Sequence, residues 1–269
     1  MLGTLAHRVE LDSNPRAFKS PPGGIFPAHR NAMATHPPPC GAEMFRPKHH
    51  TLTALRAAIP DCRGCSLYRY RDATQAVFGE GPETARIMIV GEQPGDVEDR
   101  TGHPFVGPAG RLLDAALDSA GIPRSEVYVT NAVKHFKFTR RGKRRLHDRP
   151  TRNEVVACRP WLGAELEALA PDIVVVCGAT AARSLLGEAF RITTSRGVVA
   201  DSTLPCWAFA TVHPAAVLRV PDHDQRVKAR AQLMADFAII GEKFRELPPP
   251  RNARFATSTA PDRHYRDGS

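Results

Sequence analysis

The sequence predicts a three-layer α/β/α domain built around a central four-stranded parallel sheet. Four short apolar runs, rich in β-branched residues, are the first observation, and they lie at 86–90, 127–131, 172–177 and 207–212. Continuous runs of this kind are typical of strands buried on both faces. The second observation is that helical patterns separate these runs, at 111–121, 153–170 and 180–187. Such helices supply the crossovers that parallel strands require.

Polar residues follow three of the four strands, at the point where each strand ends. The first strand runs into the turn GEQPG at 91–95, the second ends at Asn131, and His213 follows the fourth. Ligands of such sheets bind in the crevice beyond the carboxyl ends of the strands, so we expect the chemistry there. The third strand ends in Cys177 and Gly178, and we expect Cys177 to be a buried core residue.

The helix expected at 153–170 carries a start signal and an internal breaker. Thr151 and Glu154 have the spacing of a capping box, in which each side chain bonds the backbone N–H of the other residue. Pro160 lacks an N–H and is expected to kink or interrupt the helix after its first turns.

Composition separates a folded body from two tails. Residues 1–48 and 247–269 are rich in proline and basic residues without periodicity, so we expect disordered tails there and one domain over 49–246. The sequence has no run of eighteen apolar residues and no signal pattern, which predicts a cytoplasmic protein without a membrane partner, and we expect a monomer. In that reducing compartment, core thiols, metal ligands or nucleophiles must account for the six cysteines, Cys40, Cys62, Cys65, Cys158, Cys177 and Cys206.

Positive charge is concentrated in one segment. The chain carries a formal charge of +9, and seven Lys or Arg against one Asp give +6 of it within residues 137–149. A cationic loop of this kind attracts a polyanion such as nucleic acid, although a solvated basic loop is the plainer interpretation of the segment taken alone.

Several motifs together resemble a known family. The segments GEQPGDVEDRTGHPFVGPAGRLLD (91–114), VTNAVK (129–134) and TVHPAAVLR (211–219), preceded by CRGC (62–65), resemble the uracil-DNA glycosylase superfamily, especially its iron–sulfur branch. The resemblance covers most of residues 50–245. The loop KRRLH (143–147) resembles that of the UdgX class, whose members couple themselves covalently to uracil-containing DNA. The resemblance implies uracil-containing DNA as the partner, and we expect single-stranded DNA to be preferred.

The resemblance also assigns binding and leaving-group roles. Phe105 stacks on a flipped base and Asn131 matches the O4 and N3–H edge of uracil, while Gly91, Gly95 and Asp96 complete the binding set. The alternative is that Phe105 is a core residue and Asn131 a strand-end cap. His213 resembles the histidine that donates to the departing uracil oxygen, a bond that stabilises the transition state more than the ground state.

The nucleophile distinguishes the classes of the family. Many hydrolytic relatives place an aspartate or another water-orienting group at the position of Gln93, and an amide cannot act as a general base at neutral pH. The resemblance therefore points to His147 as the nucleophile, with Glu92 orienting the ring and accepting its other proton. The adduct on the sugar C1′ is a neutral N-glycosyl imidazole that leaves poorly, so a single turnover is expected. Cationic side chains of the same loop are expected to bind DNA phosphates, namely Lys143, Arg144 and Arg145.

A metal site is expected apart from the pocket. In the iron–sulfur branch two later cysteines join the CxxC pair to hold a 4Fe-4S cluster, and this chain has only one of the two, Cys158. His135 stands where the other is expected, and histidine replaces cysteine on iron in Rieske centres. Cys62, Cys65, His135 and Cys158 are therefore the expected ligands. Zinc is the alternative, because three cysteines and one histidine suit it equally well.

Two other functions stay open on the sequence alone. One is a conventional hydrolytic iron–sulfur uracil-DNA glycosylase with turnover. The other is a metal-stabilised module that binds nucleic acid without cutting it. Glu92, Asn131, His147 and His213 together favour an enzyme, because binding alone needs only the cationic loop and a pocket.

Overall fold

Four parallel strands form the centre of the computed structural model, which describes residues 41–69 and 75–249. They are β1 (Ile87–Gly91), β2 (Val127–Asn131), β5 (Ile173–Cys177) and β7 (Trp207–Thr211). The sheet order is β2-β1-β5-β7-β6, and Ile87 pairs with both Val127 and Ile173. The predicted parallel sheet is confirmed, with one addition, because the two-residue strand β6 (Gly197–Val198) runs antiparallel along β7.

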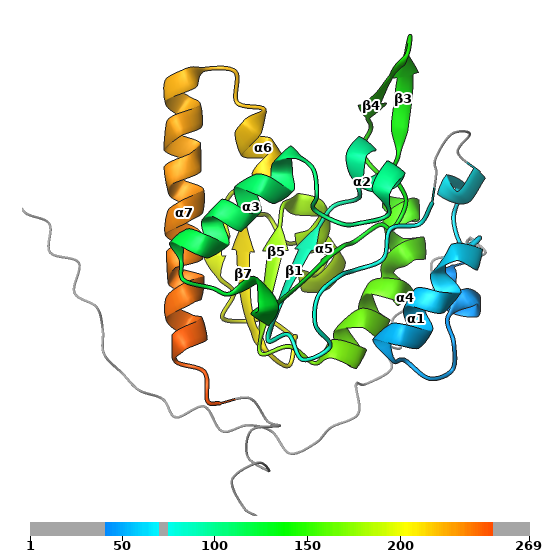
Figure 1. Ribbon diagram of the computed structural model, residues 1–269, viewed down its shortest axis with the longest axis horizontal. Coiled ribbons are helices and arrows are strands. Elements are labelled where there is room, and N and C mark those ends of the chain that lie inside the picture. The colour runs from blue at the N-terminus through cyan, green and yellow to red at the C-terminus, as the bar shows by residue number, and fades with distance from the viewer. Residues whose placement is uncertain (1–40, 70–74, 250–269) are drawn as a thin grey trace, which may run out of the picture. The chain divides into compact units, whose positions relative to one another are not determined.

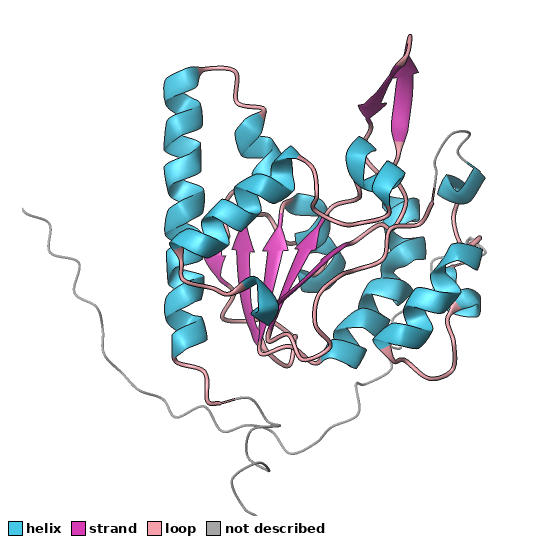
Figure 2. Ribbon diagram, viewed as in Figure 1, coloured by secondary structure: helices cyan, strands magenta, loops and turns pink. Residues whose placement is uncertain are grey.

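Helices cover both faces of the sheet, which confirms the three predicted layers (Figures 1 and 2). One face packs against α3 (Pro108–Ser119), α6 (Pro214–Leu218) and α7 (His223–Arg245). The other packs against α1 (Leu52–Ala58), α4 (Arg152–Leu169) and α5 (Ala179–Leu186). Successive strand residues point to opposite faces, so Ile87 and Ile89 join the first core, and Met88 and Val90 the second. The remaining helices are α2 (Asp96–Thr101) and the 3-10 turns Ala42–Phe45, Ile59–Asp61, Ser66–Arg69 and Arg124–Glu126.

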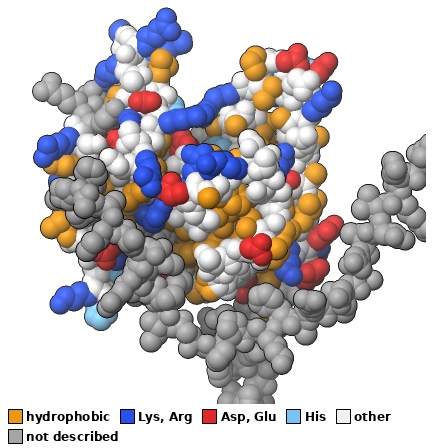
Figure 3. All heavy atoms as spheres, turned by 180° about the vertical axis from the view of Figure 1, so that it is seen from behind, with side chains coloured by type: hydrophobic (Ala, Val, Ile, Leu, Met, Phe, Trp, Pro, Cys, Tyr) orange, Lys and Arg blue, Asp and Glu red, His pale blue; other side chains and the backbone are white. Residues whose placement is uncertain are grey.

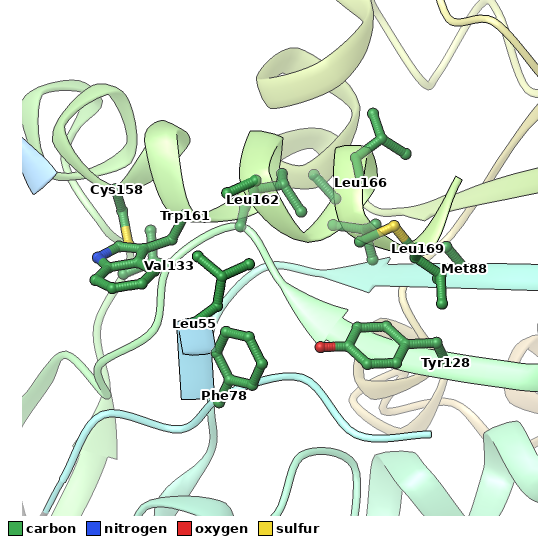
Figure 4. Packing of buried hydrophobic residues seen from close by; sticks show 14 of the residues in the cluster. Leu55, Phe78, Met88, Tyr128, Val133, Cys158, Trp161, Leu162, Leu166 and Leu169 are labelled. Atoms are coloured by element: carbon green, nitrogen blue, oxygen red, sulfur yellow. The ribbon is translucent and has the colours of Figure 1, made fainter. Parts of the chain in front are cut away.

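The core between the sheet and α4 combines large apolar side chains with one buried ion pair. Trp161 and Tyr128 are fully buried there (Figure 4). Lys134 pairs with Glu165, and both side chains are at most 1% exposed. The Tyr128 hydroxyl donates to Oε1 of Glu165 at 3.0 Å. Burial is the main cause that raises the pKa of Tyr128, and the negative charge of Glu165 raises it further. Lys134 Nζ also donates to the backbone oxygen of Asn131 at 2.9 Å, so this buried network fixes the end of β2.

The capping box at the start of α4 is confirmed. The Glu154 amide donates to the Thr151 hydroxyl at 3.3 Å, and the Thr151 amide donates to the Glu154 carboxylate at 2.6 Å. Pro160 does not interrupt α4, which continues from Arg152 to Leu169 with the proline inside it, so of the two expected effects, a kink or an interruption, the interruption is wrong. Pro160 cannot donate a backbone hydrogen bond, but Cys158 before it and Trp161 after it are buried, and this packing stabilises the helix.

The folded body extends beyond the predicted limits of 49 and 246. Ala42 is 1% exposed and belongs to the core, and Leu247 packs against the other core cluster. The rest of the predicted tails, 1–40 and 250–269, lies outside the described residues. Within the described part, no helix is long and apolar enough to cross a membrane.

The basic segment predicted as a loop forms a hairpin. β3 (Phe138–Arg141) pairs antiparallel with β4 (Arg144–His147), and Phe138 lies opposite His147. Gly142 in the turn has a φ of 59°, a left-handed conformation that glycine adopts without strain. The hairpin projects beyond the carboxyl ends of the parallel strands (Figure 1).

Candidate active site

A cavity of about 710 Å³ lies at the carboxyl ends of the parallel strands. Predicted site residues from all three strand ends line it, and so does the base of the hairpin. The lining includes Glu92, Phe105, Asn131, His147 and His213. Cavities of this volume typically bind a small molecule or a chemical group of similar size.

Three of these side chains converge on Gly91, the last residue of β1. A Cβ added at Gly91 would lie 2.4 Å from Oδ1 of Asn131, 2.8 Å from Cζ of Phe105 and 3.2 Å from Nε2 of His213. Only a glycine leaves room for the three groups together. An amide oxygen, an aromatic ring and an imidazole nitrogen therefore meet at the end of β1, a set of groups that can recognise a flat, polar ring.

The Phe105 ring is held by an unusual backbone. Phe105 has a φ of 58°, which is rare for a residue with a side chain, and its carbonyl oxygen would lie 1.5 Å from a Cβ at Gly110. The first turn of α3 therefore packs directly against this backbone. The ring lies 6.0 Å from that of His213 with an interplanar angle of 23°. In this conformation Phe105 lines the cavity, and its side chain also packs against the edge of the core.

Glu98, which the sequence did not single out, joins two loops of the cavity wall. The side chain is 8% exposed, and its two oxygens accept N–H bonds from Gly95 at 3.1 Å and Gly107 at 2.8 Å. The amide of Gly95, predicted to bind substrate, is thereby directed to Glu98. The carboxylate fixes the turn after β1 against the segment that carries Phe105.

The surroundings of His213 make it a neutral hydrogen-bond donor. Burial lowers the pKa of His213 to about 4, although the carboxylate of Glu92 opposes that shift. The Ala215 amide donates to Nδ1 of His213 at 3.1 Å, so the single proton of the neutral ring is on Nε2. Nε2 is the atom that faces Gly91. The ring therefore directs an N–H into the cavity without carrying a charge.

Glu92 is bonded from two sides. Nε2 of His147 lies 3.2 Å from Oε1 of Glu92, and the Thr180 hydroxyl donates to Oε2 at 2.5 Å. Burial by itself raises the pKa of Glu92, but the bonds from His147 and Thr180 outweigh it and hold the pKa below its usual value. Glu92 is therefore an ionised carboxylate that contacts His147 at neutral pH.

Arg145 anchors the hairpin and does not face solvent. Its side chain is 4% exposed, and its Nη1 donates to Oδ2 of Asp99 at 2.6 Å. The guanidinium also pairs with Asp96 and lies 5.4 Å from the ring centre of Phe136 and 5.0 Å from that of Phe138. The prediction that Arg145 binds DNA phosphates is therefore corrected, because buried Asp99 holds the guanidinium against α2. Asp96, predicted to bind substrate, lines the cavity but directs its carboxylate to Arg145 and Arg100.

Gln93 closes the base of the hairpin. Its amide nitrogen donates to the carbonyls of Lys137 at 3.2 Å and Asp148 at 2.9 Å, and its oxygen accepts the Lys137 amide at 3.1 Å. These two residues flank the hairpin on either side. Gln93, which stands at the position of the water-orienting group of many hydrolytic relatives, uses both ends of its amide to hold the hairpin that carries His147.

Cationic side chains remain on the outer part of the hairpin. Lys143 and Arg144 are exposed. Figure 3 shows Lys and Arg side chains at the tip of the projecting hairpin and beside the hollow next to it. This surface is positively charged, as the sequence predicted for residues 137–149.

The four predicted metal ligands line a second, small cavity between the segment 59–65, α4 and the segment after β2. They are Cys62, Cys65, His135 and Cys158. Among the described residues, no three His, Cys, Asp or Glu side chains meet closely enough to form a binding group for one metal ion. The four side chains therefore surround a cavity and do not converge on a single position.

Donors to sulfur surround this second cavity. Nε1 of Trp161 donates to Sγ of Cys62 at 3.2 Å, and the Lys134 amide donates to Sγ of Cys158 at 3.4 Å. Burial raises the pKa of Cys158 to about 12 and lowers the pKa of His135 to about 4. The donor set fits an iron–sulfur cluster, since N–H bonds to sulfur stabilise bound thiolates and a neutral imidazole is the form that binds iron.

The tautomer of His213 is open to measurement. We expect ¹⁵N NMR of the histidine side chains to show His213 as a neutral ring protonated on Nε2 from pH 8 down to about 5, because its pKa is lowered to about 4. The signal is assigned by its loss in His213→Ala. A midpoint near neutral pH, or a proton on Nδ1, would contradict this description of the donor.

Comparison with known proteins agrees with this geometry. A model of the uracil DNA glycosylase superfamily matches residues 78–238. A protein named type-4 uracil-DNA glycosylase from Thermotoga maritima is 39% identical over 169 residues, which cover 62% of this chain and 83% of that protein. Proteins of the same name from Sulfurisphaera tokodaii (33% over 202 residues; 72% and 88% covered) and Archaeoglobus fulgidus (37% over 193 residues; 68% and 88% covered) are also similar. The chain therefore belongs to the uracil-DNA glycosylase superfamily.

Proposed function

We propose that this protein excises uracil from DNA and then stays joined to the DNA through a covalent bond between His147 and the sugar C1′. The observation that carries the proposal is the contact of His147 with the ionised Glu92 inside the cavity that also holds Asn131, Phe105 and His213. The type-4 relatives are named for uracil-DNA glycosylase activity, which supports the excision half.

The excision half uses the groups around Gly91. A flipped uracil stacks on Phe105, and the Asn131 amide pairs with its O4 and N3–H. When the glycosidic bond breaks, its electron pair goes to uracil, and the Nε2–H of His213 donates to the oxygen that gains negative charge. A neutral, preorganised donor is effective here because it gains most as charge develops in the transition state.

The capture half uses the hairpin. One imidazole nitrogen of His147 uses its lone pair to form a bond to C1′ of the oxocarbenium-like sugar. The proton on the other nitrogen passes to the Glu92 carboxylate, so the ring ends as a neutral N-glycosyl imidazole. Without reprotonation this group would have to leave as the imidazolate anion, which is a poor leaving group, and the product therefore persists. This half is similar to the chemistry of the UdgX class, whose KRRLH loop corresponds to residues 143–147.

Hydrolysis with turnover is the competing function. It requires a group that orients water, and Gln93 is occupied by the backbone of Lys137 and Asp148. The Glu92 carboxylate is likewise occupied by His147 and Thr180. These contacts favour capture over water activation in the resting protein.

We propose single-stranded DNA as the preferred partner, because an unpaired uracil costs least to flip. One chain suffices, since every group named above belongs to it. Lys143 and Arg144 bind the phosphates beside the lesion, and we propose a 4Fe-4S cluster held by Cys62, Cys65, His135 and Cys158. Each ligand of such a cluster binds a different iron, which suits four side chains that surround a cavity.

His147→Ala separates the two halves of the reaction. We expect the variant to give no protein–DNA band on a denaturing gel with a single-stranded uracil oligonucleotide, while release of free uracil continues, because Asn131 and His213 are unchanged. His213→Ala is the matched comparison and should lower both products by about 10²-fold, the loss typical of one oxyanion donor. A heat- and detergent-resistant band from His147→Ala would assign the bond to another residue.

Arg144 and Arg145 should differ sharply despite being neighbours. In the unreactive His147→Ala background, Arg144→Ala should reduce the slope of log affinity against log salt by about 0.7–0.9, the value of one lost phosphate contact. Arg145→Ala should leave that slope unchanged, and in the reactive protein it should abolish capture, because the hairpin loses its anchor on Asp99. Equal slopes for His147→Ala with and without Arg144→Ala would show that the hairpin tip does not contact the DNA backbone.

The cluster is tested by colour and metal content. Protein purified without oxygen should be brown, absorb broadly near ~400 nm and contain about four irons per chain, since thiolate-to-iron charge transfer produces that absorbance. His135→Cys should retain the iron and His135→Ala should lose part of it. A colourless protein with one zinc per chain would favour the zinc alternative.

A further inference from the structure

We propose that Thr180 is a positioning residue for the Glu92–His147 pair: its hydroxyl fixes the Glu92 carboxylate so that the opposite oxygen faces His147. The inference rests on the proposed function, in which that pair delivers the nucleophile and accepts its proton. Neither the sequence motifs nor the resemblance singled out this threonine.

The two oxygens of Glu92 have partners on different elements. Oε2 accepts the Thr180 hydroxyl of α5 at 2.5 Å, and Oε1 lies 3.2 Å from Nε2 of His147 at the end of β4. A carboxylate with only one of these partners keeps rotational freedom about its terminal torsion, which is broad for glutamate. Two partners on opposite oxygens define the plane of the group. The Thr180 bond thus selects the orientation in which Glu92 meets the imidazole.

Thr180 itself is held rigidly by the start of α5. Gly178, the residue before the helix, donates its N–H to the carbonyl of Thr211 at 2.9 Å and accepts the Ala182 amide at 3.0 Å. Gly178 has a φ of 89°, and a Cβ there would lie 3.2 Å from the Cβ of His213. The turn that carries Thr180 is therefore fixed against β7 and against the segment that bears His213.

The hydroxyl of Thr180 is directed away from its own helix. Threonine inside a helix often bonds its hydroxyl back to a carbonyl one turn earlier. Ser184, one turn further along α5, follows this pattern and donates to the Thr180 carbonyl at 2.8 Å. Thr180 is only the second residue of the helix, and its hydroxyl crosses to the residue after β1 instead. The bond to Glu92 therefore has a purpose beyond the stability of α5.

The electrostatic surroundings of Glu92 make the effect measurable. The titratable groups that face it are His147 from the hairpin and His213 from the segment before α6, and Thr180 supplies a neutral donor from α5. Burial raises the pKa of Glu92, whereas the bonds from His147 and Thr180 lower it. Removal of the Thr180 hydroxyl leaves burial less opposed. The pKa of Glu92 then rises, and the acid limb of the capture rate moves to higher pH.

Three variants test the proposal. Thr180→Val keeps the shape and removes the donor, Thr180→Ser restores the donor, and Ser184→Ala removes a hydroxyl of the same helix that does not reach Glu92. We expect Thr180→Val to slow single-turnover capture about tenfold, the loss typical of one hydrogen bond to a charged group, and to shift the acid limb upward. Thr180→Ser and Ser184→Ala should stay within about twofold of wild type with its pH profile.

Two results would contradict the positioning role of Thr180. A wild-type rate and pH profile in Thr180→Val would overturn the proposal. Equal losses in all three variants with unshifted pH profiles would also overturn it, because they would indicate damage to α5 instead of a role at Glu92.

The DNA-free protein separates this inference from the proposed function. If wild type forms no adduct, the covalent function fails, and ¹³C NMR titration of the Glu92 carboxyl still tests Thr180, with Glu92→Gln assigning the signal. A higher pKa of Glu92 in Thr180→Val, with the wild-type value in Thr180→Ser, supports the positioning role. An unchanged pKa in Thr180→Val rejects it.

Discussion

The ion pair between Arg145 and the buried carboxylate of Asp99 is the interaction on which the rest of the site depends. Asp99 is fully buried in α2, directly after the turn that leaves β1, and Arg145 is two residues before His147 on β4. A buried pair of this kind costs about 3–5 kcal/mol when one partner is removed, because the other charge is left uncompensated. The pair therefore specifies where the hairpin docks. Gln93 completes the attachment, because it hydrogen-bonds the backbone on both sides of the hairpin. His147 is consequently brought into contact with Glu92.

The docked hairpin brings together two groups whose pKa values are both lowered, with opposite consequences for their charge. Burial keeps His213 neutral, with its pKa lowered to about 4 and its proton on Nε2. Hydrogen bonds from His147 and Thr180 overcome burial at Glu92 and keep that carboxylate ionised. One site thus contains a neutral donor for the leaving group and an anion for the proton of the nucleophile. Such separation of roles among neighbouring titratable groups is how one pocket performs two proton-dependent steps.

The sequence predicted the sheet and the residues at its strand ends, because both follow from local patterns. Buried parallel strands are apolar throughout, and their carboxyl ends must share one edge, so the order of residues alone grouped Glu92, Asn131 and His213. The hairpin could not be predicted in the same way, since its strands are exposed and charged and lack an apolar alternation. The inward direction of Arg145 could not be predicted either, because it depends on Asp99, 46 residues earlier in the chain. In the local sequence Arg145 looks the same as the four cations that surround it. Thr180 and Glu98 were missed for a related reason: each acts through tertiary bonds that composition and spacing do not encode.

Delivery of His147 to the sugar carbon by the hairpin is tested most directly by locating the covalent bond in the reacted protein. Protein that has reacted with a uracil oligonucleotide can be digested with nuclease and protease, and the modified peptide sequenced by mass spectrometry. We predict a residual deoxyribose adduct on the imidazole of His147 and an unmodified peptide for His213, the other histidine of the cavity. An adduct on another residue, or free uracil accumulating beyond one equivalent of protein without any adduct, would contradict the account.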